Sequence, residues 1–258
     1  MVDANEAIHR LRNAGVPSPE ADWRWISQAG LRADEQEEAL RRRCAREPLQ
    51  LILGTAPFRY LEVAVRRGVF IPRPETEWLV QVCLDRALSP GARIVEPCTG
   101  TGAIAAALAM EANPEAIWAT DINPEAVALA TLNCASYPVV TITQGDLLSS
   151  VPSDWVGTVD LLIANPPYLD AKTVHLAAPE VKDWDPYNAL VGPGAEGWDS
   201  VRDLIDLAPQ WLRPGGWLAL EDDPARVYKS AQRAGQWATR TEVIADLAGR
   251  ERFVLAQY

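Results

Sequence analysis

A short run beginning at Asn165 carries groups suited to holding a planar amino group. Asn165, Pro166, Pro167 and Tyr168 directly follow the apolar stretch 161–164, which predicts a strand. Proline fixes φ and has no N–H, so the run presents two acceptors, the Asn165 side-chain oxygen and the Pro166 carbonyl, and Tyr168 adds a flat ring for stacking. These groups suit an amide or an exocyclic base amine as the substrate.

The nitrogen of such a group is a weak nucleophile because its lone pair is conjugated. Two acceptors that hold both N–H bonds turn the lone pair toward an electrophile and stabilise the positive charge that develops on nitrogen. No strong base is needed before transfer, because the proton becomes acidic only after nitrogen has bonded to carbon. The methyl sulfonium of S-adenosylmethionine is the natural electrophile, so the run predicts methyl transfer, with Asn165, Pro166 and Tyr168 as the catalytic residues.

A glycine turn and a later carboxylate predict a nucleotide-like ligand. The segment 98–103 follows a predicted strand and opens a predicted helix, and its glycines Gly100 and Gly102 let a ligand approach bare backbone N–H groups. Asp121 ends the next strand, 21 residues after Gly100, where its carboxylate can accept hydrogen bonds from both ribose hydroxyls. With Ala105, the glycines also fit the dinucleotide fingerprint, so a nicotinamide dehydrogenase and a turn without a ligand are the alternatives at this point.

A parallel sheet must bring these residues together. From residue 93 the chain alternates strand-like and helix-like segments, which predicts a doubly wound α/β fold that binds ligands at the carboxyl ends of its strands. The predicted strands are 94–96, 117–122, 139–143, 160–164, 217–221, 241–245 and 252–256, and the predicted helices are 75–88, 103–112, 124–135, 201–211 and 226–234.

The first part of the chain has a different pattern. Residues 3–46 carry helical signals and predict a small bundle. The alternating residues 61–65 and 69–71, with Arg66, Arg67 and Gly68 between them, predict a β-hairpin. We therefore expect three parts, an N-terminal helical domain over 1–55, a hairpin linker over 56–74 and a catalytic domain over 75–258.

Composition narrows the class of protein. The 258 residues have a formal net charge of −11, and the whole excess lies after residue 78, so bulk DNA or RNA is not expected as a substrate. Two histidines and four separated cysteines predict no metal site, and no G-x-S-x-G elbow supports a hydrolase. Without a long apolar run or a signal-peptide pattern, we expect a cytoplasmic protein.

Further motifs, in order along nearly the whole chain, carry a resemblance to a known family. Residues 71–77, Ile-Pro-Arg-Pro-Glu-Thr-Glu, are the most specific of them, whereas the run at Asn165 alone would also admit DNA adenine methyltransferases. Together the motifs resemble the HemK/PrmC family of protein-(glutamine-N5) methyltransferases. The other matching segments are 46–50, 52–54, 179–181, 185–186, 189–190 and 246–250.

The resemblance implies a class I S-adenosylmethionine-dependent methyltransferase with a Rossmann-like, seven-stranded, mostly parallel sheet and a helical domain that helps to recognise the substrate. The implied partner is a class I peptide chain release factor, which presents the glutamine of its Gly-Gly-Gln loop. Asn165 and Pro166 would hold the target amide and Tyr168 would pack it. The implied cofactor-binding residues are Glu96, Cys98, Thr99, Gly100, Thr101, Gly102, Asp121, Ile122, Asp146, Leu147 and Asn165, and the implied substrate-binding residues are Arg73, Glu75, Glu77 and Pro167.

The chain departs from the family pattern at a few positions. Pro97 and Cys98 stand where Leu-Gly is usual, Glu96 replaces an aspartate, Leu147 replaces an aromatic residue of some members, and 222–224 follow where a glycine is usual. A paralogue that keeps the amide-orienting run but methylates a small molecule or another amide or amine therefore stays the alternative. Trp184 and Trp198 lie in the long loop after Tyr168, where a lid or acceptor wall could form.

Overall fold

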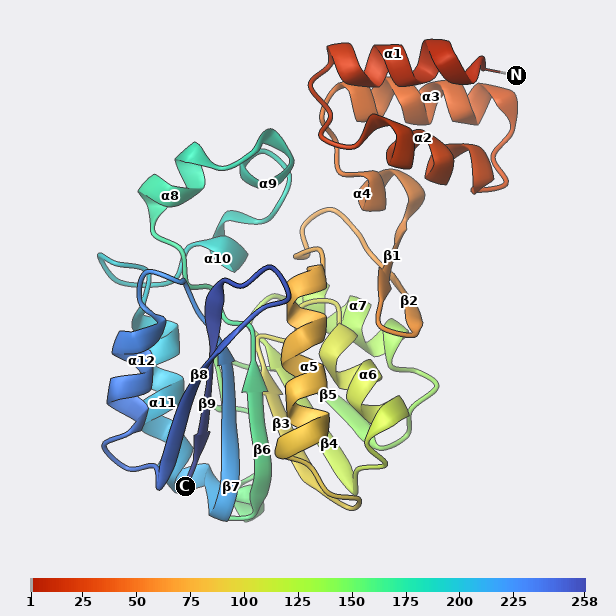
Figure 1. Cartoon of the computed structure of the whole chain (residues 1–258). Helices are drawn as coiled ribbons and strands as arrows, with labels where there is room; N and C mark the ends of the chain where they lie inside the picture. The colour runs from red at the N-terminus through yellow and green to blue at the C-terminus, as the bar shows by residue number, and fades with distance from the viewer. Residues whose placement is uncertain (1) are drawn as a thin grey trace.

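The predicted strands form one seven-stranded sheet in the computed structural model, which describes residues 2–258 (Figure 1). The strand order is β5-β4-β3-β6-β7-β9-β8, all adjacent pairs are parallel up to β7, and β9 runs antiparallel to both β7 and β8. The predicted α/β fold is therefore confirmed. The strands are β3 (Arg93–Pro97), β4 (Ala116–Asp121), β5 (Val140–Gln144), β6 (Val159–Ala164), β7 (Leu212–Glu221), β8 (Arg240–Ala245) and β9 (Glu251–Gln257).

The strand order switches between β3 and β6. The chain runs through β3, β4 and β5 to one edge and returns to β6 on the other side of β3. Cys98 follows β3, Asp121 ends β4 and Asn165 follows β6. Because the carboxyl ends of parallel strands meet at one edge, these three residues gather where doubly wound sheets bind ligands.

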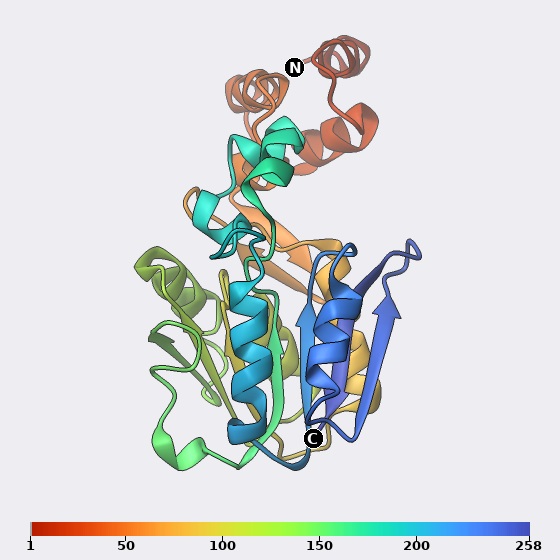
Figure 2. The same cartoon turned by 90° about the vertical axis from the view of Figure 1, so that its left-hand side faces the viewer.

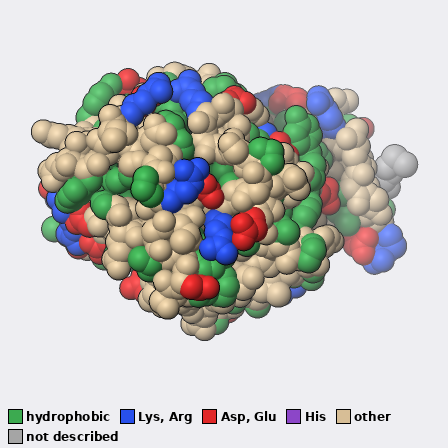
Figure 3. Space-filling view, turned by 90° about the horizontal axis from the view of Figure 1, so that it is seen from below, with side chains coloured by type: hydrophobic (Ala, Val, Ile, Leu, Met, Phe, Trp, Pro, Cys, Tyr) green, Lys and Arg blue, Asp and Glu red, His purple; other side chains and the backbone are tan. Residues whose placement is uncertain are grey.

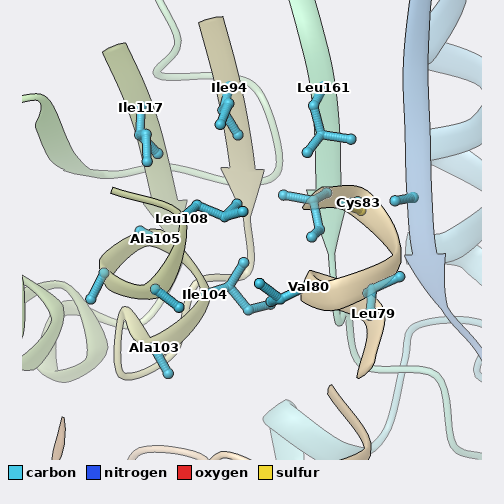
Figure 4. Packing of buried hydrophobic residues seen from close by; sticks show 14 of the residues in the cluster. Leu79, Val80, Cys83, Ile94, Ala103, Ile104, Ala105, Leu108, Ile117 and Leu161 are labelled. Carbon is cyan, nitrogen blue, oxygen red and sulfur yellow. The ribbon is translucent and has the colours of Figure 1, made fainter. Parts of the chain in front are cut away.

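Helices cover both faces of the sheet (Figures 1 and 2). The face formed by Ile94, Ile117 and Leu161, each at most 1% exposed, packs against buried residues of α5 and α6 (Figure 4). Val95 and Leu162 alternate with them and pack against α11 and α12. Each fully buried isoleucine or leucine contributes about 2 kcal/mol, so both layers stabilise the edge that carries the site. The helices are α5 (Pro74–Arg86), α6 (Ala103–Glu111), α7 (Pro124–Asn133), α11 (Asp199–Trp211) and α12 (Val227–Ala234).

The helical signals near the N-terminus correspond to a small bundle with its own core of Leu11, Ile26 and Leu40. It stands beyond the carboxyl ends of the strands (Figure 1). The proposed boundaries at residues 55 and 74 stay predictions. Its helices are α1 (Ala4–Asn13), α2 (Pro19–Gln28), α3 (Ala33–Cys44) and α4 (Leu49–Leu53).

The predicted hairpin is wrong in its position. The paired strands are β1 (Thr55–Phe58) and β2 (Leu61–Ala64), with the turn at Arg59, whose φ is +53°. The sequence does not predict β1 because it contains Pro57, and proline within a run argues against a strand. The segment 69–71 does not pair, and Val69 instead packs against residues of α7.

The loop between β6 and α11 folds into three short helices and is tied to the helical bundle. The Glu180 carboxylate accepts hydrogen bonds from Arg46 at 2.6 Å and from Arg43 at 2.9 Å. Burial alone would raise the pKa of Glu180, but the two guanidinium groups outweigh it and lower the pKa from 4.5 to about 2. The carboxylate is therefore charged at neutral pH and holds the loop against the bundle. The short helices are α8 (Ala171–Leu176), α9 (Pro179–Lys182) and α10 (Tyr187–Leu190).

The amino ends of the strands lie at the opposite end of the sheet and carry paired charges. Seen from below, it shows cationic and anionic side chains side by side among scattered apolar ones (Figure 3). Two ion pairs involve residues at the amino ends of the strands, Arg93 with Glu115 and Arg213 with Asp160. Within residues 2–258, no helix has the length and apolar character needed to cross a membrane.

Candidate active site

A cavity of about 950 Å³ opens at the carboxyl edge of the sheet, where the strand order switches. Its walls come from the glycine turn, the ends of β4 and β6, the segment before α5 and the α10 loop. The cavity thus joins the predicted cofactor and amide positions in one space. The predicted site residues that line it are Arg73, Cys98, Thr99, Gly100, Thr101, Asp121, Ile122, Asp146, Leu147, Asn165 and Pro167.

Six predicted site residues do not line this cavity, namely Glu75, Glu77, Glu96, Gly102, Pro166 and Tyr168. Their predicted roles stay predictions. Thr76, which lies between the two glutamates and was not predicted, does line it. The motif therefore exposes its threonine to the site, whereas its glutamates lie outside the wall.

Asp121 organises the glycine turn. One carboxylate oxygen accepts the backbone N–H of Gly100 at 2.8 Å, and the other accepts that of Asn123 at 2.9 Å. Burial raises the pKa of Asp121, and these backbone hydrogen bonds oppose the rise. A carboxylate has about four lone-pair positions, so both oxygens keep capacity for two further donors such as vicinal hydroxyls.

The turn uses left-handed backbone at alternate positions. Cys98, Gly100 and Gly102 have φ values of +59°, +57° and +77°. A left-handed non-glycine residue costs roughly 1–2 kcal/mol, so Cys98 holds strain at a position where a glycine would have none. Its side chain lies in the cavity wall.

The two glycines differ in what a side chain would meet, which gives a paired prediction. A Cβ at Gly102 would lie 3.0 Å from Ala130 Cβ and 3.1 Å from Cys134 Sγ, whereas at Gly100 no described atom lies within 4 Å. We expect G102A to lower the free energy of unfolding by about 2 kcal/mol, through strain and crowding. G100A should cost about 1 kcal/mol of strain but weaken cofactor binding about tenfold, because its methyl group enters the cavity.

Denaturant unfolding and calorimetric titration with S-adenosylmethionine measure the two effects. A G100A chain that binds cofactor as tightly as the wild type would contradict this placement of the ligand over the turn.

Buried polar atoms beneath the turn lack partners. Neither carboxylate oxygen of Glu96 nor the hydroxyl of Thr99 has a hydrogen-bond partner among residues 2–258. Burial raises the pKa of Glu96 well above its usual value, which favours the neutral acid. Thr99 is 6% exposed and lines the cavity, but its hydroxyl oxygen is itself buried and is not part of the exposed wall.

Asn165 is the polar side chain that β6 presents to the cavity. Its Nδ2 lies 3.1 Å from Thr76 Oγ1, and Thr76 Oγ1 lies 2.7 Å from Glu221 Oε2. Glu221 ends β7 and is 1% exposed. The Tyr168 hydroxyl donates to the other oxygen of Glu221 at 3.1 Å, which fixes the Tyr168 ring against the end of β7.

Comparison with known proteins decides the family. Residues 74–180 match the family model described as the methyltransferase small domain. The chain is 39% identical to the release factor glutamine methyltransferase of Streptomyces coelicolor, over 86% of this chain and 84% of that one. It is 34% identical to that of Bifidobacterium longum, over 98% and 97%.

The chain belongs to the release factor glutamine methyltransferase family.

Solved structures agree on the fold. A Pyrococcus furiosus methyltransferase superposes with a TM-score of 0.56 at 21% identity, covering 76% of this chain and 88% of that one. A Thermus thermophilus 16S rRNA methyltransferase in complex with AdoMet and guanosine gives 0.58 at 16% identity, covering 79% and 49%.

The release factor glutamine methyltransferase motif around Arg73 closes one side of the cavity. Its guanidinium pairs with Asp185, whose side chain has no exposed surface, and stacks 4.7 Å from the Phe70 ring centroid. Asp185 directly precedes the α10 residues of the cavity wall. Arg73 therefore fastens the α10 loop to the segment before α5, in addition to lining the cavity.

Asp222, one of the positions that depart from the family pattern, has partners of its own. The Ser230 hydroxyl donates to Asp222 and accepts from Trp198 Nε1 at 2.7 Å. Trp198 is 8% exposed and packs in the core, so it forms no acceptor wall. Trp184 is half-buried with the Arg67 guanidinium 5.1 Å from its ring centroid. Both tryptophans thus serve to pack the loop.

Proposed function

We propose that this chain transfers the methyl group of S-adenosylmethionine to the side-chain amide nitrogen of the glutamine in the Gly-Gly-Gln loop of a class I peptide chain release factor. The observation that carries the proposal is that Asp121 and Asn165 line one cavity. The family membership and the names of the relatives support this choice of acceptor.

The glycine-turn half of the cavity fits the cofactor. Asp121 would accept the two ribose hydroxyls, and the bare backbone at Gly100 leaves room for the ligand. Ile122 and Leu147 line the apolar part and Asp146 lies beside them, which suits an adenine ring and its exocyclic amine. When bound, the cofactor supplies a methyl group on a positively charged sulfur as the electrophile.

The Asn165 half orients the acceptor. The Asn165 side-chain oxygen and the Pro166 carbonyl would each accept one N–H of the glutamine amide, so the nitrogen lone pair points across the cavity. The same two oxygens stabilise the positive charge that develops on nitrogen as the new bond forms. The new nitrogen–methyl bond replaces the sulfur–methyl bond, whose electron pair stays on sulfur, and one of the two amide protons, which becomes acidic at that stage, passes to water. Pro167 lines the cavity and would pack the glutamine side chain.

The parts of the chain around the cavity suit a protein substrate. The helical bundle of α1 to α4 would help to hold the release factor. The α8–α10 loop, fixed by Glu180 to that bundle, would shape the path of the Gly-Gly-Gln loop toward Asn165. Glu75 and Glu77 would position the segment before α5 rather than contact the amide.

Mass spectrometry of a purified release factor after incubation with the chain and S-adenosylmethionine tests the proposal. We expect the loop glutamine to gain one methyl group in place of one hydrogen, and a release factor whose loop glutamine is replaced should gain none. A small-molecule amide methylated in place of an untouched release factor would instead support a paralogous activity. Calorimetry should show binding of S-adenosylmethionine and none of NAD.

A further inference from the structure

Asn165 is the end of a hydrogen-bond chain that leads away from the cavity. The chain runs from Asn165 Nδ2 to Thr76 Oγ1 on α5 and from there to Glu221 Oε2 at the end of β7. Three elements far apart in sequence thus meet behind one side chain. Thr76 and Glu221 are 4% and 1% exposed, so water does not compete for these bonds.

The hydrogen bonds from Asn165 through Thr76 to Glu221 have a fixed donor-to-acceptor direction. An ionised carboxylate only accepts, and a threonine hydroxyl has a single hydrogen to give. The short 2.7 Å contact commits the Thr76 hydrogen to Glu221, so Thr76 can only accept from Asn165. Of the two ends of the Asn165 amide only the NH2 group can donate, and it must therefore face Thr76.

Glu221 is surrounded by groups that require it to accept. The Tyr168 hydroxyl donates to Oε1, and the Arg252 guanidinium lies 3.5 Å from the same oxygen. Burial raises the pKa of Glu221, and the contacts with Thr76, Arg252 and Tyr168 oppose that rise. Three donors around one carboxylate match its ionised form, which has no hydrogen to return to Thr76.

We propose that Thr76, directed by Glu221, is a positioning residue that holds the Asn165 amide with its oxygen toward the acceptor. The inference rests on the proposed function and deepens it. Without the Thr76–Glu221 hydrogen bonds, the Asn165 amide can turn over and present its own NH2 group to the NH2 group of the substrate. Two donors would then face each other. With Thr76 in place, the Asn165 side-chain oxygen faces the substrate as an acceptor, so the site selects an amide over the corresponding carboxylate, whose oxygens it would repel.

Replacement of Thr76 by valine removes the hydroxyl and keeps the shape. We expect T76V to lower kcat for release factor methylation about tenfold, while the Kd for S-adenosylmethionine changes less than twofold. T76S, which keeps the hydroxyl, should retain at least half of the wild-type kcat. A residue that only fills space would give the opposite order, because serine loses a methyl group that valine keeps.

Glu221→Gln tests the direction of the chain by a second route. The two donors beside Oε1 keep the glutamine oxygen at that position, so its NH2 group faces Thr76 and donates to it. The Thr76 hydrogen then points to Asn165, which must turn its oxygen inward and its NH2 toward the acceptor. We expect E221Q to reduce kcat at least as much as T76V, again with unchanged cofactor affinity and with a thermal unfolding curve that shows a folded chain.

The outcomes separate this inference from the proposed function. Wild-type kcat in both T76V and E221Q, or equal losses in T76V and T76S, would overturn the role of Thr76 and leave the methyltransferase proposal standing. No methylation of the release factor by the wild-type chain would overturn both.

Discussion

Replacement of Asn165 by alanine is expected to lower the rate of release factor methylation about a thousandfold at saturating cofactor. Removal of one preorganised group that stabilises developing charge costs on the order of a hundred- to a thousandfold in other active sites. Asn165 in addition provides one of the two acceptors that aim the lone pair. Asn165 directly follows β6, so truncation of its side chain leaves the sheet edge and the glycine turn in place.

The measurement is single-turnover methyl transfer to a purified release factor, together with calorimetric titration of S-adenosylmethionine. We expect the cofactor Kd of N165A to stay within about threefold of the wild type, because Asp121 and the turn carry most of that binding. Asn13→Ala, on the exposed end of α1 away from the cavity, serves as the matched asparagine control. N165A with a rate near that of the control would contradict the amide-orientation mechanism.

Asp121→Ala should weaken S-adenosylmethionine binding about a hundredfold. The variant loses two charge-assisted acceptors for the ribose, each worth about 1.5–3 kcal/mol, partly offset by water. It also frees the N–H groups of Gly100 and Asn123, which Asp121 now orders. In contrast to N165A, the defect is expected in the cofactor Kd and KM, and kcat at saturating cofactor should recover to within about threefold.

A conservative variant refines this result. D121N keeps one carbonyl oxygen and should fall between the wild type and D121A, with about a tenfold loss of affinity. If D121A bound S-adenosylmethionine with wild-type affinity, the assignment of the ribose to the end of β4 would be wrong.

The residues at the ends of strands could be predicted because topology alone brings them together. Gly100, Asp121 and Asn165 each follow or end a strand with a clear apolar pattern, and parallel strands place those ends at one edge. The positions of Thr76 and Glu221 relative to Asn165 could not be predicted in this way. Their hydrogen bonds span 89 and 145 residues and depend on how α5 crosses the end of β7.

The errors in the N-terminal half have a local cause. Hydrophobic alternation favoured pairing of 61–65 with 69–71, but the partner of β2 is the segment that contains Pro57. Alternation does not distinguish a strand from an extended segment that packs on a helix, as Val69 does on α7. The Glu180 contacts with Arg43 and Arg46 join segments over 130 residues apart. Contacts at this separation cannot be predicted from hydrophobic periodicity, which reports only local structure.

Because Glu180 binds the bundle, the loop beside the active site is held by two separate parts of the molecule. Near its two ends, at Tyr168 and Trp198, the loop is hydrogen-bonded to Arg226 and Ser230, at the start of α12 and within it. Its middle is held by Arg43 and Arg46 of the N-terminal part of the chain. A partner that bound the bundle and tilted it would also move α9, which lies in the loop just before the α10 residues of the cavity wall. Removal of residues 1–54 would take away both arginines that bind Glu180 and leave Asp121 and Asn165 in the chain. We therefore expect such a truncation to loosen the α8–α10 loop beside the cavity without removing the groups that line it at the strand ends.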